Sequence, residues 1–151
     1  MIALACDHGG FELMNEVRKY LDSDGYEYKD FGTFSTDSCD YPVLTLKATE
    51  AITDGVCDRG IFICGTGIGM SMAANKIPGI RAGLCTDRYM AEMTRSHNDA
   101  NVLVMGGRVT PADVAVDIVK AFLCTEFSNG ENHCRRIAML NELDGIRKEQ
   151  I

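Results

Sequence analysis

One segment near the middle of the chain places a thiol directly before a glycine-rich turn. The apolar run Ile61–Ile63 leads into Cys64, and the sequence Gly-Thr-Gly-Ile-Gly follows at positions 65–69. This order predicts a buried strand, a tight turn and the start of a helix. Backbone N–H groups left free at such a helix N-terminus attract anionic oxygen, and a thiol at the same place is pushed toward thiolate. The segment therefore predicts a reactive group beside a stabiliser of negative charge.

Several kinds of site use a glycine turn, and the spacing separates them. A dinucleotide fingerprint needs G-x-G-x-x-G, and this turn misses that spacing by one residue. Asp87 lies about 20 residues farther on, where such sites have an acidic residue, so binding of a nucleotide cofactor stays an open alternative. A P-loop is excluded because no Gly-Lys-Ser/Thr follows. A cysteine phosphatase would need an arginine where Met70 stands. A purely structural role, with Cys64 as a buried thiol at the end of a strand, also stays open.

Other polar groups follow two further predicted strands. Asp7 and His8 come directly after an apolar run, and Arg108 follows another. Because ligands bind at the carboxyl ends of strands in open α/β sheets, we expect these side chains to converge with Cys64. His8 alone could simply cap a strand, and His97 alone could simply interact with a helix dipole. The joint pattern at several strand ends favours a functional site.

Strand-like and helix-like segments alternate along the whole chain. Five strands are predicted, at residues 2–6, 26–31, 60–64, 80–85 and 101–105. Thr110 is expected to be the N-cap of a helix that has Pro111 in its first turn, and residues 132–149 are expected to form a final helix. The pattern predicts an α/β fold, a doubly wound, Rossmann-like five-stranded parallel sheet with helices on both faces and a C-terminal helix. A single domain over residues 1–151 is expected.

Composition narrows the class of protein. The net charge of −7 argues against a nucleic-acid surface, and no apolar run approaches the roughly 20 residues that span a bilayer. No basic stretch or cleavage site follows Met1, so no signal peptide is predicted and a cytoplasmic protein is expected. The seven cysteines are odd in number, scattered and without a C-x-x-C pair, which favours reduced thiols over disulfides or structural zinc.

Seven short motifs carry a resemblance to one known family. They are Cys6–Gly10, Asp40–Pro42, Ile63–Gly69, Ala73–Lys76, Gly79–Ala82, His97–Asn101 and Gly106–Val109. In this order they resemble ribose-5-phosphate isomerase type B, in the family shared with galactose-6-phosphate isomerase subunits. The resemblance covers nearly all of residues 2–140.

The resemblance implies an aldose–ketose isomerase that interconverts ribose 5-phosphate and ribulose 5-phosphate through a cis-enediolate, with no metal or organic cofactor. Cys64 would be the base that moves the proton between C1 and C2, and Thr66 would relay a proton between the two sugar oxygens. His97 would open the sugar ring, aided by Asp7. The backbone N–H groups that hold the developing oxyanion are expected around Gly65, Gly67, Ile68 and Gly69.

The resemblance also implies how substrate is held. Phosphate would contact the residues at positions 8, 108 and 136, which are His8, Arg108 and Arg136 here. Asn98 would bind the sugar, and Tyr41 would line the pocket. Arg136 matches the second of two phosphate-binding arginines of the family, and Asn132 stands in the place of the first. This departure implies weaker phosphate binding or a substrate that differs in its distal part.

Partners follow from the same resemblance. The family is dimeric and each site takes residues from both subunits, which implies a homodimer and leaves pairing into a tetramer open. The segment 96–101 precedes the last strand, so it faces away from the Cys64 turn unless it serves a neighbouring subunit. His97, Asn98, Arg108 and Arg136 would then reach a partner's Cys64.

Two other functions stay open at this point. One is isomerisation of a six-carbon sugar phosphate of the allose or galactose type, or of a free sugar. The other is a non-catalytic domain that binds a sugar phosphate or a nucleotide. Neither a nucleic acid nor a membrane is expected as a partner.

Overall fold

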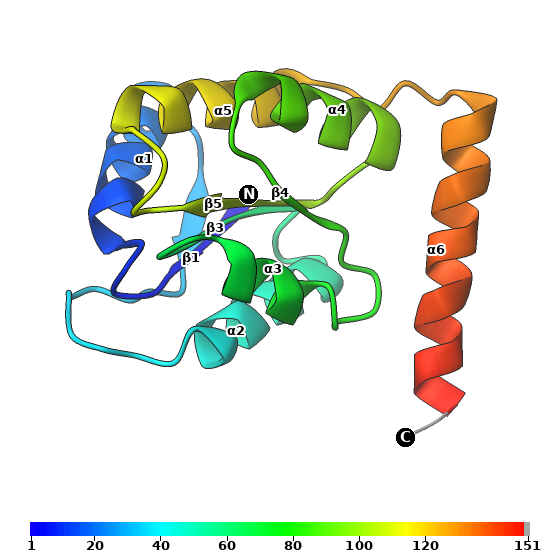
Figure 1. Ribbon diagram of the computed structural model, residues 1–151, viewed down its shortest axis with the longest axis horizontal. Coiled ribbons are helices and arrows are strands. Elements are labelled where there is room, and N and C mark those ends of the chain that lie inside the picture. The colour runs from blue at the N-terminus through cyan, green and yellow to red at the C-terminus, as the bar shows by residue number, and fades with distance from the viewer. Residues whose placement is uncertain (150–151) are drawn as a thin grey trace.

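The structure is a computed structural model that describes residues 1–149, and the last two residues of the predicted domain, 150 and 151, lie outside the described residues. Strands and helices alternate from the N-terminus (Figure 1). The strands are β1 (Ile2–Cys6), β2 (Tyr28–Asp30), β3 (Arg59–Cys64), β4 (Ala82–Leu84) and β5 (Val102–Gly106). The helices are α1 (Phe11–Ser23), α2 (Tyr41–Thr53), α3 (Ile68–Ala74), α4 (Arg88–Asn98), α5 (Ala112–Cys124) and α6 (Glu131–Glu149).

All five strands run parallel in one sheet, in the order β2-β1-β3-β5-β4. The three central strands, β1, β3 and β5, end side by side, because Cys6 pairs with Ile63 and Cys64 pairs with Gly106. Apart from Arg59, every residue of these three strands is buried, as expected for strands covered on both faces. The predicted fold class is confirmed.

Helices cover both faces of the sheet (Figure 1). One core lies between the sheet and helices α1 and α5, and it includes the buried Ala91 of α4. The other core lies between the sheet and helices α2 and α3, and it contains Phe62 and Cys64. The chain therefore leaves β1 toward one face and leaves β3 toward the other. This divergence makes a crevice at the carboxyl ends of β1 and β3, which is where open α/β sheets bind ligands.

The turns after β1, β3 and β5 touch one another through their backbones. A methyl group added at Gly107 would collide with the carbonyl oxygen of Gly9, and one added at Gly10 would collide with the carbonyl oxygen of Ile63. The N–H of Gly107 also donates to the carbonyl of Cys64 at 2.8 Å. Only glycine permits this approach, so the three turns are locked together at one edge of the sheet.

Helix α6 stands apart from the layered body, to which residues 125–130 connect it (Figure 1). Asp144 of α6 accepts a hydrogen bond from the N–H of Gly79 at 2.9 Å, which fixes the far part of the helix. Three large apolar side chains of α6, Met139, Leu140 and Leu143, are exposed. The helix therefore presents an apolar face that its own chain leaves uncovered.

Several predicted boundaries differ from the structure. The edge strands are shorter than predicted, with β2 at Tyr28–Asp30 and β4 at Ala82–Leu84, and neither contains a fully buried residue. Helix α5 begins at Ala112, and Pro111, not Thr110, occupies the capping position because its backbone is extended, with ψ at 150°. The predicted C-terminal helix is confirmed and begins one residue earlier than expected, at Glu131.

We expect the substitution Gly107→Ala to destabilise the protein. The new methyl group meets backbone atoms that cannot move without separating the turns after β1 and β5, so the free energy of unfolding should fall by about 1–3 kcal/mol. Urea denaturation measures the change. Gly145→Ala is the matched control, because Gly145 lies within α6 with open space around it, and it should cause no loss. Equal stability of the two variants would contradict the proposed lock.

Candidate active site

A cavity of about 230 Å³ opens at the carboxyl ends of the central strands. It is bordered by the turn after β1, the start of α2, the turn and helix after β3, and the turn after β5. The residues that border it are Asp7, His8, Gly9, Tyr41, Cys64, Gly65, Thr66, Gly69 and Arg108. Eight of these nine residues, all except Gly9, were predicted as site residues from the sequence.

Cys64 is the thiol that borders this cavity. It is the last residue of β3 and is only 4% exposed. Three other thiols, those of Cys6, Cys57 and Cys85, are buried and do not border this cavity. Burial raises the pKa of all three, to about 12 for Cys6 and Cys85. Cys64 is therefore the buried cysteine that is positioned to act on a ligand in the cavity.

At the turn after Cys64, the carbonyl groups bond to the turn after β5, whereas two N–H groups are left for a ligand. The carbonyls of Cys64 and Gly65 accept hydrogen bonds from the N–H groups of Gly107 and Arg108, at 2.8 and 2.9 Å. Within residues 1–149, no protein group accepts a hydrogen bond from the N–H of Gly65 or Thr66. Both residues border the cavity, so their N–H groups can stabilise negative charge on a ligand oxygen.

Gly67 and Ile68 belong to the same turn but do not border the cavity. Gly67 adopts a left-handed conformation, with φ at 81°, which directs the chain into α3. The N–H of Ile68 donates to the hydroxyl of Thr66 at 3.4 Å, which orients that hydroxyl. Gly67 and Ile68 therefore shape the turn, whereas Gly65, Thr66 and Gly69 place beside the cavity N–H groups that have no acceptor in the described part of the chain.

Asp7 has a structural role in addition to its place at the cavity. Its Oδ1 accepts hydrogen bonds from the N–H groups of Gly9 and Gly10, at 2.8 and 3.0 Å. The side chain is buried and closes the turn that follows β1. One carboxylate oxygen is thus committed to holding the turn, and any chemical role falls to the other oxygen.

His8 is oriented by a loop that lies far away in the sequence. The backbone N–H of Cys39 donates to Nδ1 of His8 at 3.3 Å. A backbone N–H can only donate, so Nδ1 is the acceptor and the ring proton resides on Nε2. His8 thus offers an N–H donor from its other nitrogen, which suits an anionic or hydroxyl group of a ligand.

Tyr41 and Arg108 complete the border of the cavity. Tyr41 packs so closely on Gly69 that a methyl group there would meet the tyrosine ring. Arg108 is exposed and lies beside Gly65 of its own chain. The expectation that Arg108 would reach a partner's Cys64 is therefore wrong, since the turn after β5 meets the turn after β3 within one chain.

The other predicted residues lie away from this cavity. His97 and Asn98 are in the last turn of α4, and Asn132 and Arg136 are in the first turns of α6. Asn98 borders a second cavity of about 400 Å³ that α6 forms with the body of the protein. This separation agrees with the position of segment 96–101 before β5, because the amino end of a strand lies opposite the edge that holds Cys64.

Sequence reasoning missed two residues near these groups. Gly9 borders the cavity, and the two glycines after His8 were the available signal for a close backbone approach. His133 contacts His97, with 4.2 Å between the ring centroids. That contact depends on how α6 packs, and nothing in the sequence near either histidine indicates it.

The described part of the chain contains no cluster of three or more His, Cys, Asp or Glu residues arranged to hold a metal ion. Among its helices, none is both long and apolar enough to cross a membrane.

Comparison with known proteins decides the family. A family model described as Ribose/Galactose Isomerase matches residues 2–140. The chain belongs to this family. It is 42% identical to ribose-5-phosphate isomerase B of Escherichia coli over 146 residues, which cover 97% of each protein. A solved structure of ribose-5-phosphate isomerase B from Clostridium thermocellum superposes with a TM-score of 0.94 at 50% identity, covering 97% of this chain and 98% of that one.

The family membership confirms the resemblance found in the sequence and makes the protein an aldose–ketose isomerase. The family also contains proteins with other names. A D-erythrulose-4-phosphate isomerase of Pectobacterium atrosepticum is 39% identical over 130 residues, which cover 85% of this chain and 86% of that protein.

We expect two substitutions of Asp7 to show whether its acceptor oxygen or its charge holds the turn after β1. Asp7→Ala leaves the N–H groups of Gly9 and Gly10 without an acceptor and should lower the free energy of unfolding by about 1–3 kcal/mol. Asp7→Asn keeps an oxygen in the same place and should retain most of that stability. Urea denaturation of both variants provides the comparison. If Asp7→Asn is as unstable as Asp7→Ala, the carboxylate charge, and not the acceptor oxygen, holds the turn.

Proposed function

We propose that the protein interconverts ribose 5-phosphate and ribulose 5-phosphate, with Cys64 as the base. The observation that supports this most strongly is the position of a buried thiol beside two free N–H groups in a cavity that also holds Asp7 and His8. Removing a proton from carbon next to a carbonyl requires a base on one side and a stabiliser of oxygen charge on the other. The names of the relatives support the choice of pentose phosphate.

In the proposed reaction, the Cys64 thiolate removes the proton from C2 of the open-chain aldose. The electron pair of the C–H bond forms the C1–C2 double bond, and negative charge develops on O1. The N–H groups of Gly65 and Thr66 stabilise that charge, and one such donor is typically worth about 3–4 kcal/mol. The hydroxyl of Thr66 passes a proton between the two oxygens. The Cys64 thiol then returns its proton to C1, which gives the ketose.

Ring opening is proposed to need a second chain. His97 and Asn98 lie away from the cavity of their own chain, so in our proposal they act in the cavity of a partner in a homodimer. Exposed apolar side chains on two parts of the surface, one on α2 and α3 and the other on α6, support such an association. Helices α2 and α3 expose Val43, Leu46, Ile68 and Met72, and α6 exposes Met139, Leu140 and Leu143. Apolar faces of this kind mark surfaces that another protein covers.

The distal phosphate is proposed to contact His8 and Arg108 of one chain and Arg136 of the other. Asn132 supplies no positive charge, and Glu131 beside it is acidic. The absence of one charged contact lowers phosphate affinity by about 1.5–3 kcal/mol relative to a site with two α6 arginines. This pattern leaves room for a sugar phosphate with a different distal part, such as a six-carbon sugar phosphate.

A panel of aldoses tests the choice of substrate. Five- and six-carbon sugars are compared with and without phosphate, by kcat/KM for conversion to the ketose. The proposal expects the highest value for ribose 5-phosphate and a large loss for free ribose. A higher value for a six-carbon phosphate would keep the chemistry and change the substrate.

We expect Cys64→Ala to keep the fold and lose isomerisation. A general base typically contributes about 10²–10⁴-fold to the rate, so conversion of ribose 5-phosphate should fall at least a hundredfold, and Cys64→Ser should fall similarly. Circular dichroism and urea denaturation serve as controls for folding. Uptake of solvent deuterium at the substrate carbon, followed by NMR, reports proton removal directly and should fall with the conversion rate. Substantial conversion by Cys64→Ala would refute the assignment of the base.

A further inference from the structure

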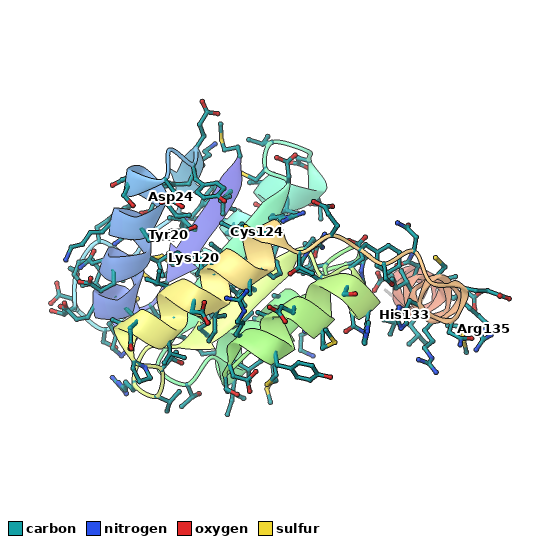
Figure 2. The ribbon with its side chains drawn as sticks, turned by 90° about the horizontal axis from the view of Figure 1, so that it is seen from above. Tyr20, Asp24, Lys120, Cys124, His133 and Arg135 are labelled. Carbon is teal, nitrogen blue, oxygen red and sulfur yellow. The ribbon has the colours of Figure 1, made fainter. Side chains whose placement is uncertain are left out.

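The imidazole rings of His97 and His133 lie against each other where α4 ends and α6 begins. Their centroids are 4.2 Å apart and their planes are tilted by 34°. His97 is exposed on the last turn of α4, and His133 is half-buried on the first turn of α6. Figure 2 shows His133 on the side of α6 nearer α4 and Arg135 on the far side. His133 is therefore the α6 side chain that meets the proposed ring-opening residue.

His133 is held in place by hydrogen bonds with the segment that leads into α6. The hydroxyl of Ser128 lies 2.8 Å from Nδ1 of His133, and the N–H of His133 donates to the carbonyl of Gly130 at 2.9 Å. The N–H of Ser128 donates to the carbonyl of Ser96 on α4 at 3.0 Å. These contacts join α4, the connecting segment and α6, so the His133 ring has a fixed place beside His97.

We propose that His133 is a positioning residue that holds the His97 ring in the orientation needed to open the cyclic sugar. The proposal rests on the proposed function of His97. An exposed imidazole on a helix turn can adopt several rotamers, and contact with a fixed ring restricts it to one. The ring face of His97 is then covered, while its edge nitrogens stay available to a substrate held in the partner's cavity.

The ring-opening step needs only proton transfers. A base takes the proton from the anomeric hydroxyl on C1, and the electron pair of that O–H bond forms the C1=O1 double bond of the aldehyde. The bond between C1 and the ring oxygen breaks with its electron pair going to the ring oxygen, which then receives a proton. His97 can accept the first proton and return it to the ring oxygen, so atoms and charge balance without a co-reactant. The proposed role of His133 is to keep one nitrogen of His97 aligned through both transfers.

The charges around His133 fit this role. Partial burial, together with His97 on α4 and Arg136 on α6, lowers the pKa of His133. The connecting segment contributes the neutral hydroxyl of Ser128. A neutral His133 can face His97 while that ring carries a proton during the reaction, because an aromatic face attracts a cation.

The test compares a step that needs ring opening with one that does not. Ribose 5-phosphate is cyclic for most of its time, whereas ribulose 5-phosphate stays open because phosphate blocks the hydroxyl that would close the ring. The rate of conversion of ribose 5-phosphate depends on ring opening and on enediolate formation together. Uptake of solvent deuterium at C1 of ribulose 5-phosphate reports enediolate formation alone.

We expect His133→Ala to lower kcat/KM for ribose 5-phosphate roughly tenfold, since a small misplacement of a catalytic group has an effect of this order or larger. Deuterium uptake into ribulose 5-phosphate should change less than twofold. His133→Phe keeps a ring against His97 and should recover most of the loss. His133→Gln keeps a hydrogen-bonding group for Ser128 but no ring, and should not recover it.

The outcomes separate this inference from the function on which it rests. If His97→Ala impairs ribose 5-phosphate conversion selectively and His133→Ala does not, His133 has no positioning role. If His133→Ala lowers both measurements equally, its role is structural and the inference is also wrong. If His97→Ala lowers both measurements equally, the proposed role of His97 itself fails.

Discussion

Backbone contact between the turns after β1, β3 and β5 is the constraint on which the rest of the site depends. Gly10 approaches the carbonyl of Ile63, and Gly107 approaches the carbonyl of Gly9, closer than any side chain would permit. This packing fixes the end of β3, so that Cys64, the free N–H groups of the following turn and Asp7 share one small cavity. The chemistry that we propose thus depends on glycines that take no direct part in it.

The parallel sheet also explains why the candidate residues divide into two groups. Side chains that follow β1, β3 and β5 meet at the carboxyl edge, whereas His97 and Asn98 precede β5 and lie toward its amino end. Helix α6 stands beside this second group and adds His133 and Arg136 (Figure 1). In the homodimer that we propose, each chain supplies the group of residues that the cavity of the other chain lacks.

Much of this arrangement could be predicted from the sequence. The continuous apolar strands and their carboxyl-end residues follow from local pattern and from the rule that ligands bind at that edge, which is why Asp7, His8, Cys64 and Arg108 were found. The extents of β2 and β4 were overestimated because edge strands lack the full burial that fixes a boundary. The contacts of Cys39 with His8 and of His133 with His97 join segments far apart in the chain, and local pattern carries no signal for them.

Mixing two inactive variants tests most directly whether Cys64 of one chain works with His97 of another. Cys64→Ala and His97→Ala chains are unfolded together, refolded together and assayed on ribose 5-phosphate. With shared sites, half of the dimers formed at random are mixed, and each mixed dimer has one intact site, so roughly a quarter of the native activity should return. If each cavity instead used its own His97, no mixed dimer would contain an intact site, and activity would stay at the level of the separate variants.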